Sequence, residues 1–233
     1  MVRSLAGSLF LLGFFVLAGP ARADDGARYF VKMYGFENWR NAAAYSHTYG
    51  SFFRVGADQS VVRVDISWIP QDPYMPPPGD LRMPAFGDYP GQNVSIPTTN
   101  ARASGAFPAR SISVFGPYEI APQLFYAELA QSRRLFSGQV TYRGLDMQSR
   151  PESVNCVHAV AMACGDFRTG IFLRGPSASS ALVEFCAEAG LVNMVPQPEW
   201  SSYLDSPSVP RIGCDPMRSD GDISTVDCSA WQQ

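Results

Sequence analysis

Cys156 has the local sequence of a reactive cysteine. The segment 153–165, Ser-Val-Asn-Cys-Val-His-Ala-Val-Ala-Met-Ala-Cys-Gly, predicts a short buried helix with Asn155 as its N-cap and Gly165 as its stop. Cys156 then lies in the first turn, where unpaired backbone N–H groups and the helix dipole favour a negative charge. A thiol in such a place is biased toward the thiolate, which is the nucleophilic form. Cys156 is therefore either a candidate nucleophile or one half of a disulfide.

A cysteine nucleophile needs a base, and the chain has only two histidines, His47 and His158. His158 follows Cys156 by two residues, a helical spacing that places the two side chains on nearly opposite faces. We therefore expect His158 to be a packed, hydrogen-bonded histidine. His47 begins a β-rich run and is the better candidate for the base, because a histidine on a sheet facing a helix N-terminus can activate a thiol. The alternative is a histidine that is merely packed or solvated on its strand.

A third polar group would orient the imidazole. The run 61–69 is joined to the run 45–55 by Gly-Ala-Asp-Gln-Ser, which is a good hairpin signal, and it offers Asp65 and Ser67. These two side chains share one face of their strand. Whether His47 lies on that face depends on the register of the hairpin, since a slip of one residue reverses it. Asp65 is the stronger candidate because it can carry charge, with a solvated strand carboxylate as the alternative.

The run Asn-Cys-Val-His-Ala-Val at 155–160 resembles the Asn-Cys-x-His-x-Val motif of lecithin retinol acyltransferase-like proteins. These proteins belong to the circularly permuted branch of the NlpC-type papain-like enzymes, in which the histidine strand precedes the cysteine helix. The order His47, Asp65, Cys156 is similar to the order in that branch. The resemblance, over residues 45–70 and 150–175, implies a catalytic site with Cys156 as nucleophile, His47 as base and Asp65 as orienter. The Pro-rich stretch 71–108 and the C-terminal tail are not expected parts of that fold.

The chain has five cysteines. In an oxidising compartment most of them should form disulfides, but five cannot all pair within one chain. Cys164 ends one predicted helix and Cys186 lies late in the next, so these two are expected to bridge packed helices. Cys214 and Cys228 flank a Pro/Gly/Asp-rich segment and are expected to staple a loop. This scheme leaves Cys156 as a free thiol.

The N-terminal segment 1–23 predicts a secretory signal peptide. It has Arg3, an apolar stretch from Leu5 to Ala18 that is short for a membrane span, and the small-x-small site 21–23. We expect a secreted or periplasmic protein with no stable membrane insertion after cleavage. Without Arg3 and Arg22, 16 basic residues face 21 acidic ones, a net charge of −5. An acidic chain with no basic run argues against nucleic acid as a partner.

The hydrophobic pattern predicts an α+β fold: a small antiparallel sheet packed on a central Cys-bearing helix, which the resemblance makes a permuted papain-like core. The expected single domain is 24–195, with a Pro-rich insertion at 71–108 read as a semi-ordered flap and an irregular disulfide-pinned tail at 196–233. Strands are expected at 28–34, 45–55, 61–69, 111–115, 140–142 and 170–173. Helices are expected at 121–136, 153–165 and 177–189, with a short helix or turn at 37–44.

The leading functional hypothesis is an exported thiol hydrolase or acyl transferase that acts on a small peptide, amide or lipid-ester substrate. No metal-binding or phosphate-binding motif is present, so neither a metal nor another cofactor is expected. The alternative is a non-catalytic secreted or periplasmic binding or interaction domain in which Cys156 is paired. The sequence leaves the oligomeric state open.

Overall fold

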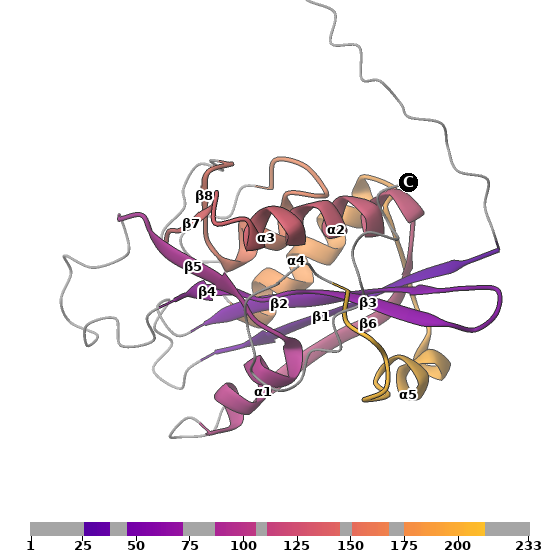
Figure 1. Cartoon of the computed structure of the whole chain (residues 1–233). Coiled ribbons are helices and arrows are strands. Elements are labelled where there is room, and N and C mark those ends of the chain that lie inside the picture. Colours follow the sequence, from indigo (N-terminus) through magenta and orange to yellow (C-terminus); the bar gives the residue numbers. More distant parts are fainter. Residues whose placement is uncertain are drawn as a thin grey trace, which may run out of the picture.

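A five-stranded antiparallel sheet forms the middle of the molecule (Figure 1). The computed structural model describes residues 26–37, 46–71, 87–105, 111–144, 151–167 and 175–212. The sheet has the order β3-β2-β1-β6-β9, and all four pairings are antiparallel. Its strands are β1 (Arg28–Phe36), β2 (His47–Val55), β3 (Val61–Ile66), β6 (Ile112–Ile120) and β9 (Val192–Pro196).

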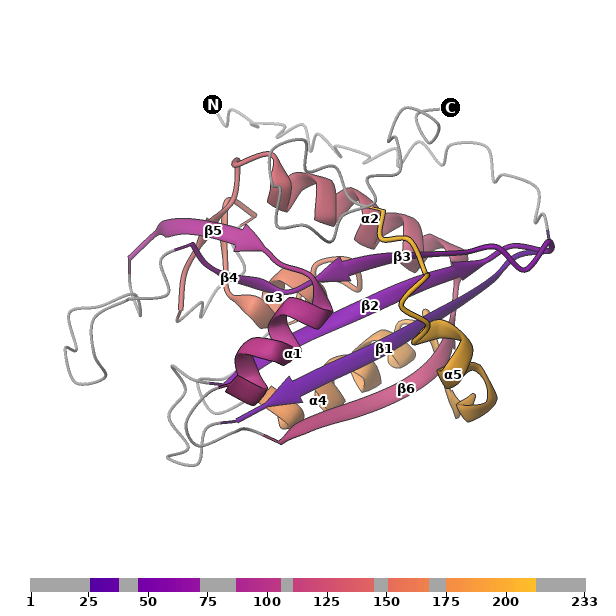
Figure 2. The same cartoon turned by 60° about the horizontal axis from the view of Figure 1, so that its bottom comes forward.

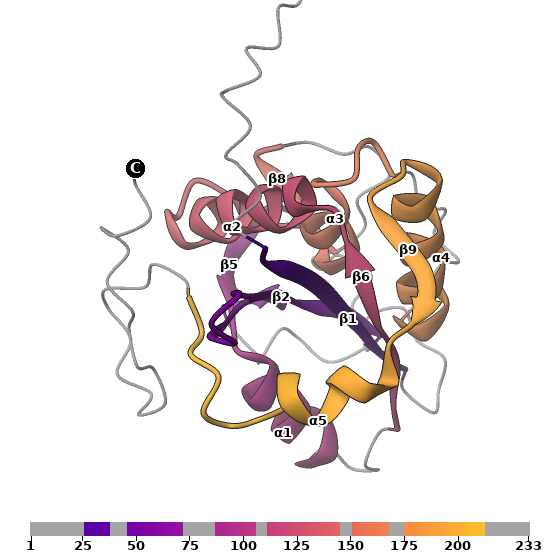
Figure 3. The ribbon, with the colours of Figure 1, turned by 90° about the vertical axis from the view of Figure 1, so that its right-hand side faces the viewer.

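Helices cover both faces of this sheet. On one face lie α2 (Pro122–Phe136), α3 (Cys156–Ala161) and α4 (Gly175–Glu188). On the other face lie α1 (Ile96–Gly105) and the short helices η2 (Pro198–Trp200) and α5 (Ser201–Leu204), as Figure 2 shows. Viewed along the sheet, β9 runs beside α4 at one edge (Figure 3). Because both faces are covered, nearly every residue of β1 and β2 is buried.

Strand alternation divides the core into one large and two smaller clusters. The large cluster lies between the sheet and α2, α3 and α4, and Phe52 of β2 belongs to it. The next residue, Phe53, points to the other face, where it packs with Leu204 of α5. A third cluster on that second face contains Tyr34, Tyr49 and Ile96 of α1.

A second, smaller sheet adjoins the first and leads into the cysteine helix. It has the order β4-β5-β7-β8, with β4 (Trp68–Pro70), β5 (Tyr89–Asn93), β7 (Thr141–Tyr142) and β8 (Ser153–Val154). The chain leaves the large sheet at Ser67 and enters the small one at Trp68. The Trp68 indole donates to the carbonyl of Val154 at 3.2 Å, which ties β4 to the residues just before α3.

The structure confirms the α+β class, the antiparallel sheet and most of the predicted elements. The hairpin of β2 and β3 and the helices α2 and α4 form where the pattern places them. The helix predicted over 153–165 forms as the shorter α3, because Ser153 and Val154 pair as β8 and the helix ends at Ala161. Pro122 stands in the first turn of α2, where its missing N–H costs no hydrogen bond. Among the described residues no helix is long and apolar enough to cross a membrane.

Three expectations about irregular segments were wrong. The predicted flap at 71–108 contains β5 and α1, both parts of the packed body. The predicted irregular tail begins instead with η2 and α5, and Leu204 is fully buried. The sequence pattern also missed β9, a strand of five residues that ends at Pro196, and the second half of β6, which Gly116 and Pro117 interrupt. The strand expected at 170–173 and most of the segment 37–44 lie outside the described residues.

Candidate functional site

Cys156 is the first residue of α3, as predicted. The side chain of Asn155 accepts a hydrogen bond from the backbone N–H of His158 at 2.8 Å, so Asn155 is the N-cap. Cys156 is free of any disulfide and is only 8% exposed. The predicted pair Cys164–Cys186 is confirmed, with a Cα–Cα distance of 5.2 Å, whereas Cys214 and Cys228 lie outside the described residues.

Three backbone N–H groups surround the Cys156 sulfur. They belong to Thr48 of β2, to Val157 and to Cys156 itself, and each stabilises a thiolate. Burial acts in the opposite direction and is the larger effect, so the pKa of the Cys156 thiol is raised. The resting thiol is therefore protonated at neutral pH. Tyr142 of β7 lies close enough that a Cys156 thiolate would raise the pKa of its phenol further, beyond the larger effect of burial.

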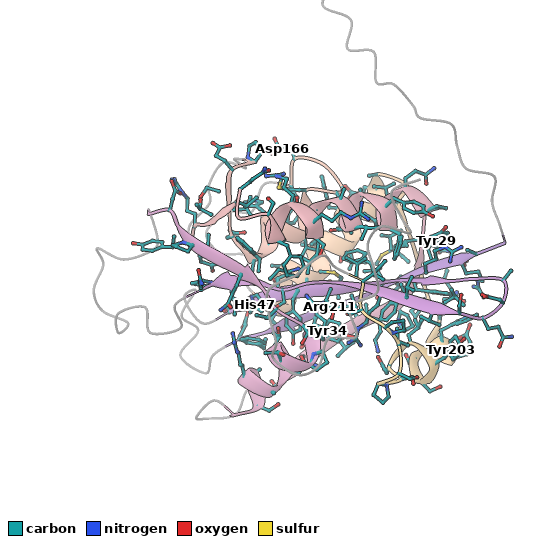
Figure 4. All side chains as sticks on the ribbon, viewed as in Figure 1. Tyr29, Tyr34, His47, Asp166, Tyr203 and Arg211 are labelled. Carbon is teal, nitrogen blue, oxygen red and sulfur yellow. A yellow bond between two sulfur atoms is a disulfide. The ribbon has the colours of Figure 1, made fainter. Side chains whose placement is uncertain are left out.

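His47, the first residue of β2, is nearly buried and held on two sides. Its ring stacks on Tyr49 at 5.1 Å between centroids and contacts Phe36 at 5.6 Å. Its Nε2 atom lies 2.9 Å from the hydroxyl of Ser67. Figure 4 shows His47 at the level of the sheet, toward the end where β4 and β5 lie. These contacts place the imidazole on the α1 side of the sheet.

The structure makes His47 and Cys156 neighbours through the residue between them, Thr48. The Thr48 N–H that bonds the sulfur belongs to the residue directly after His47. The Thr48 side chain points to the opposite face from His47 and donates to the Gly175 carbonyl of α4 at 3.1 Å. The sulfur therefore lies against β2, beside the residue that precedes Thr48. The thiol–imidazole contact expected from the sequence stays a prediction.

The structure does not bring Asp65 to His47, and the register of the hairpin explains why. Asp65 pairs with Ser51, four residues from His47 along β2, or about 13 Å at 3.3 Å per residue. Its carboxylate accepts from the Ser51 hydroxyl at 2.7 Å and from the Ile96 N–H at 3.3 Å. It also lies 3.5 Å from Arg211. Ser67, which the sequence offered as the second choice, is the residue that contacts the imidazole.

His158 fills the structural role that the helical spacing predicted. It is 2% exposed, and its Nε2 atom lies 2.8 Å from the backbone carbonyl of Phe167. This bond ties α3 to the segment that follows it and leaves His47 as the candidate base.

Sequence reasoning missed two residues that hold the site, Asn93 and Thr99. Both lie in the Pro-rich stretch that was expected to be a flap. Asn93 accepts a hydrogen bond from the Ser67 backbone N–H at 2.7 Å, and Thr99 of α1 lies 2.7 Å from the Ser67 hydroxyl. No short-range pattern marks either of them, because both act through contacts between residues 26 to 32 positions apart.

Among the described residues, no three potential metal ligands of the His, Cys, Asp or Glu type gather in one place. In comparisons with known proteins, no family model, no curated protein and no solved structure matches this chain.

Proposed function

We propose that the protein is an exported thiol hydrolase or acyl transferase with a permuted papain-like core. Cys156 is the nucleophile, His47 is the base, and Ser67 replaces Asp65 as the group that orients the imidazole. The observation that carries the proposal is the position of the sulfur: it lies in the first turn of α3 and accepts an N–H from Thr48, next to the only candidate base. The order of histidine strand, orienting strand and cysteine helix along the chain agrees with the motif at 155–160.

In the proposed reaction, His47 takes the proton of the Cys156 thiol as the sulfur attacks the carbonyl carbon of an amide or ester. A carbon–sulfur bond forms, and the carbonyl oxygen becomes an oxyanion near the Cys156 N–H. The intermediate then collapses, His47 returns the proton to the leaving amine or alcohol, and an acyl-enzyme remains. Water completes a hydrolysis, or a second nucleophile completes an acyl transfer.

The proposed reaction requires a change from the resting state. The pKa of the thiol is raised by burial, so the thiolate is scarce until the imidazole accepts its proton. In the proposed reaction, Nδ1 of His47 must come within hydrogen-bond reach of the sulfur when substrate binds. Apo sites often hold catalytic hydrogen bonds long or misaligned, and substrate binding tightens them.

The test uses mature protein and small activated esters, p-nitrophenyl acetate and p-nitrophenyl butyrate. We expect one acyl group on the Cys156 peptide by mass spectrometry, and faster release of p-nitrophenol than without protein. Cys156→Ser should lose the adduct on that peptide, and His47→Gln should slow its formation by at least tenfold, within the range for loss of a general base. His158→Gln is the matched control, because it alters the other histidine without touching the base.

The burial of Cys156 favours one alternative, a non-catalytic secreted or periplasmic binding or interaction domain. The same experiment separates the two. A Cys156 that takes no acyl group in the native protein, and reacts with iodoacetamide only after unfolding in urea, would contradict the enzyme and support the binding domain.

A further inference from the structure

We infer that Thr99 of α1 fixes the proton of neutral His47 on Nε2 by acting through Ser67. Thr99 is thus a positioning residue for the base. The role of this proton position in catalysis rests on the proposed function, whereas the proton position itself does not. One chain of hydrogen bonds, from the Ser95 carbonyl through Thr99 and Ser67 to His47, determines where each proton lies.

The chain begins at a backbone carbonyl, which can only accept. The Thr99 hydroxyl lies 3.0 Å from the carbonyl oxygen of Ser95 and donates its single proton there. The contact of 2.7 Å between the Thr99 and Ser67 hydroxyls must then use the proton of Ser67. With its proton committed to Thr99, the Ser67 oxygen can only accept from His47 across 2.9 Å. The Nε2 atom therefore carries a hydrogen.

The serine alone would not set this direction. A hydroxyl can donate or accept, so a Ser67 without Thr99 could equally donate to an unprotonated Nε2. A carboxylate orienter accepts only, and needs no such help. Because this chain has a serine where Asp65 was expected, a second residue is required to fix the direction, and α1 supplies it.

The backbone around Ser67 is held independently of its hydroxyl. The Asn93 side chain accepts from the Ser67 N–H at 2.7 Å and donates to the Asp65 carbonyl at 2.9 Å. Its amide nitrogen also lies 3.5 Å from the Ser132 hydroxyl of α2. Ser67 is fully buried, so water does not compete for its proton. These bonds keep the Ser67 oxygen in place when the Thr99 hydroxyl is removed.

The consequence for chemistry is that Nδ1 of neutral His47 carries no proton. This nitrogen adjoins the ring carbon attached to Cβ and so lies nearer to the strand backbone, to which the Cys156 sulfur is bonded through the Thr48 N–H. A ring with its proton on Nδ1 could not accept one from the thiol at that atom. The Thr99–Ser67 relay thus keeps the imidazole in the form that the proposed base needs.

The test is the protonation pattern of the imidazole by long-range ¹H–¹⁵N NMR on mature protein labelled with ¹⁵N-histidine. Only two histidines give signals, and a His158→Gln variant assigns them. His158 is an internal reference, since the Phe167 carbonyl can only accept and so holds a proton on Nε2 of that ring. In the wild-type protein above pH 8 we expect the Nε2-protonated pattern for His47 as well.

Thr99→Val keeps the shape of the side chain and removes the hydroxyl, and we expect a detectable population of Nδ1-protonated His47. Thr99→Ser should restore the wild-type pattern. Thr98→Val is the matched control, because the Thr98 hydroxyl contacts Ser95 Oγ and not Ser67. In an acylation assay, Thr99→Val should lower the rate of acylation of Cys156 several-fold. Thr98→Val should keep a rate near that of the wild type.

An Nδ1-protonated His47 in the wild-type protein would overturn the inference, and so would an unchanged pattern in a folded Thr99→Val. If Thr99→Val does not fold, Ser67→Ala replaces it, since removing the acceptor should release the Nε2 proton in the same way. A wild-type Nε2 proton in a protein that never acylates Cys156 would uphold the relay and contradict only the proposed function.

Discussion

At Cys156, two local effects compete for the same proton. The helix start and three N–H groups favour the thiolate, while the removal of the sulfur from water favours the thiol. Burial is the larger effect, so position in the first turn of a helix does not by itself make this cysteine reactive at rest. The sequence predicted the N–H donors of the helix correctly from Asn155 and the residues after it. It also predicted a buried helix, but not that burial of the sulfur would outweigh the N–H donors, because that balance depends on β2 and the small sheet.

Glu128 of α2 is the residue whose ionisation should most affect the pH dependence of stability. It is fully buried, and neither carboxylate oxygen has a hydrogen-bond partner in the described part of the chain. Burial raises the pKa of this carboxyl well above its usual value of 4.5. The unfolded chain releases the proton near 4.5 and the folded chain does not, so the contribution of Glu128 to stability is highest below that pH. It should fall by up to about 1.4 kcal/mol per pH unit until the pH passes the folded-state pKa.

Glu128→Gln should flatten this dependence, because an amide does not titrate. The measurement is urea unfolding of wild type and variant between pH 4 and pH 8, with the variant gaining relative stability as the pH rises. Glu188→Gln on the exposed side of α4 is the control and should follow the wild type. Parallel curves for wild type and Glu128→Gln would show that the carboxylate is solvated or paired.

At the scale of elements, the long periodic segments were predictable and the relations between strands were not. The helix 121–136 and the hairpin around 56–60 carry complete local signals, in the form of apolar spacing, a first-turn proline and a turn sequence. The choice between Asp65 and Ser67 depended on a register that no local residue determines. The sequence pattern did not predict β5 and α1, because the stretch that contains them is rich in proline and glycine. Pro97 lies in the first turn of α1, where proline is tolerated.

The contact between β4 and β5 provides a sharp test of the small sheet. A Cβ atom at Gly91 would overlap the Trp68 indole, which is itself fully buried. Gly91→Ala should therefore force the ring or the strand to move and destabilise the protein by about 1–3 kcal/mol, as overpacking does. Urea unfolding measures the loss.

Gly105 supplies the matched control for that substitution. A Cβ at Gly105, the last residue of α1, would meet nothing within 4 Å. Gly105→Ala should be neutral, or stabilising by up to about 1 kcal/mol through helix propensity. If Gly91→Ala proved as harmless as Gly105→Ala, the packing of Trp68 against β5 would be wrong. The tie from the Trp68 indole to the residues before Cys156 would then also be in doubt.

For the molecule as a whole, the second face of the sheet is closed by the segment 197–212. Trp200 packs on Phe30 at 4.8 Å between ring centroids, and the guanidinium of Arg28 lies 4.8 Å from the Trp200 ring. At the other end, the Ile212 N–H donates to the Arg63 carbonyl of β3 at 2.8 Å. A sheet with both faces covered explains why the candidate site lies at its end, where the large sheet gives way to the small one.

Lys32 and Asp205 join this closing segment to the middle of β1. The ammonium lies 2.6 Å from each carboxylate oxygen, and the lysine side chain is 7% exposed while that of Asp205 is half exposed. Asp205→Ala would leave a buried cation without its carboxylate partner, which is costlier than losing the pair as a unit. Because Asp205 is half exposed, we expect the free energy of unfolding to fall by about 1–3 kcal/mol, which is less than for breaking a fully buried pair.

The double variant Lys32→Met with Asp205→Ala should recover part of that loss, since it removes the unpaired charge as well. Urea unfolding of the wild type, the two single variants and the double variant gives the coupling energy directly. A double variant at least as unstable as the sum of the two single variants would mean that the pair is a solvated surface contact. The closing segment would then be held by Trp200, by the buried Leu204 and by the strand-like contact at Arg63, and not by charge.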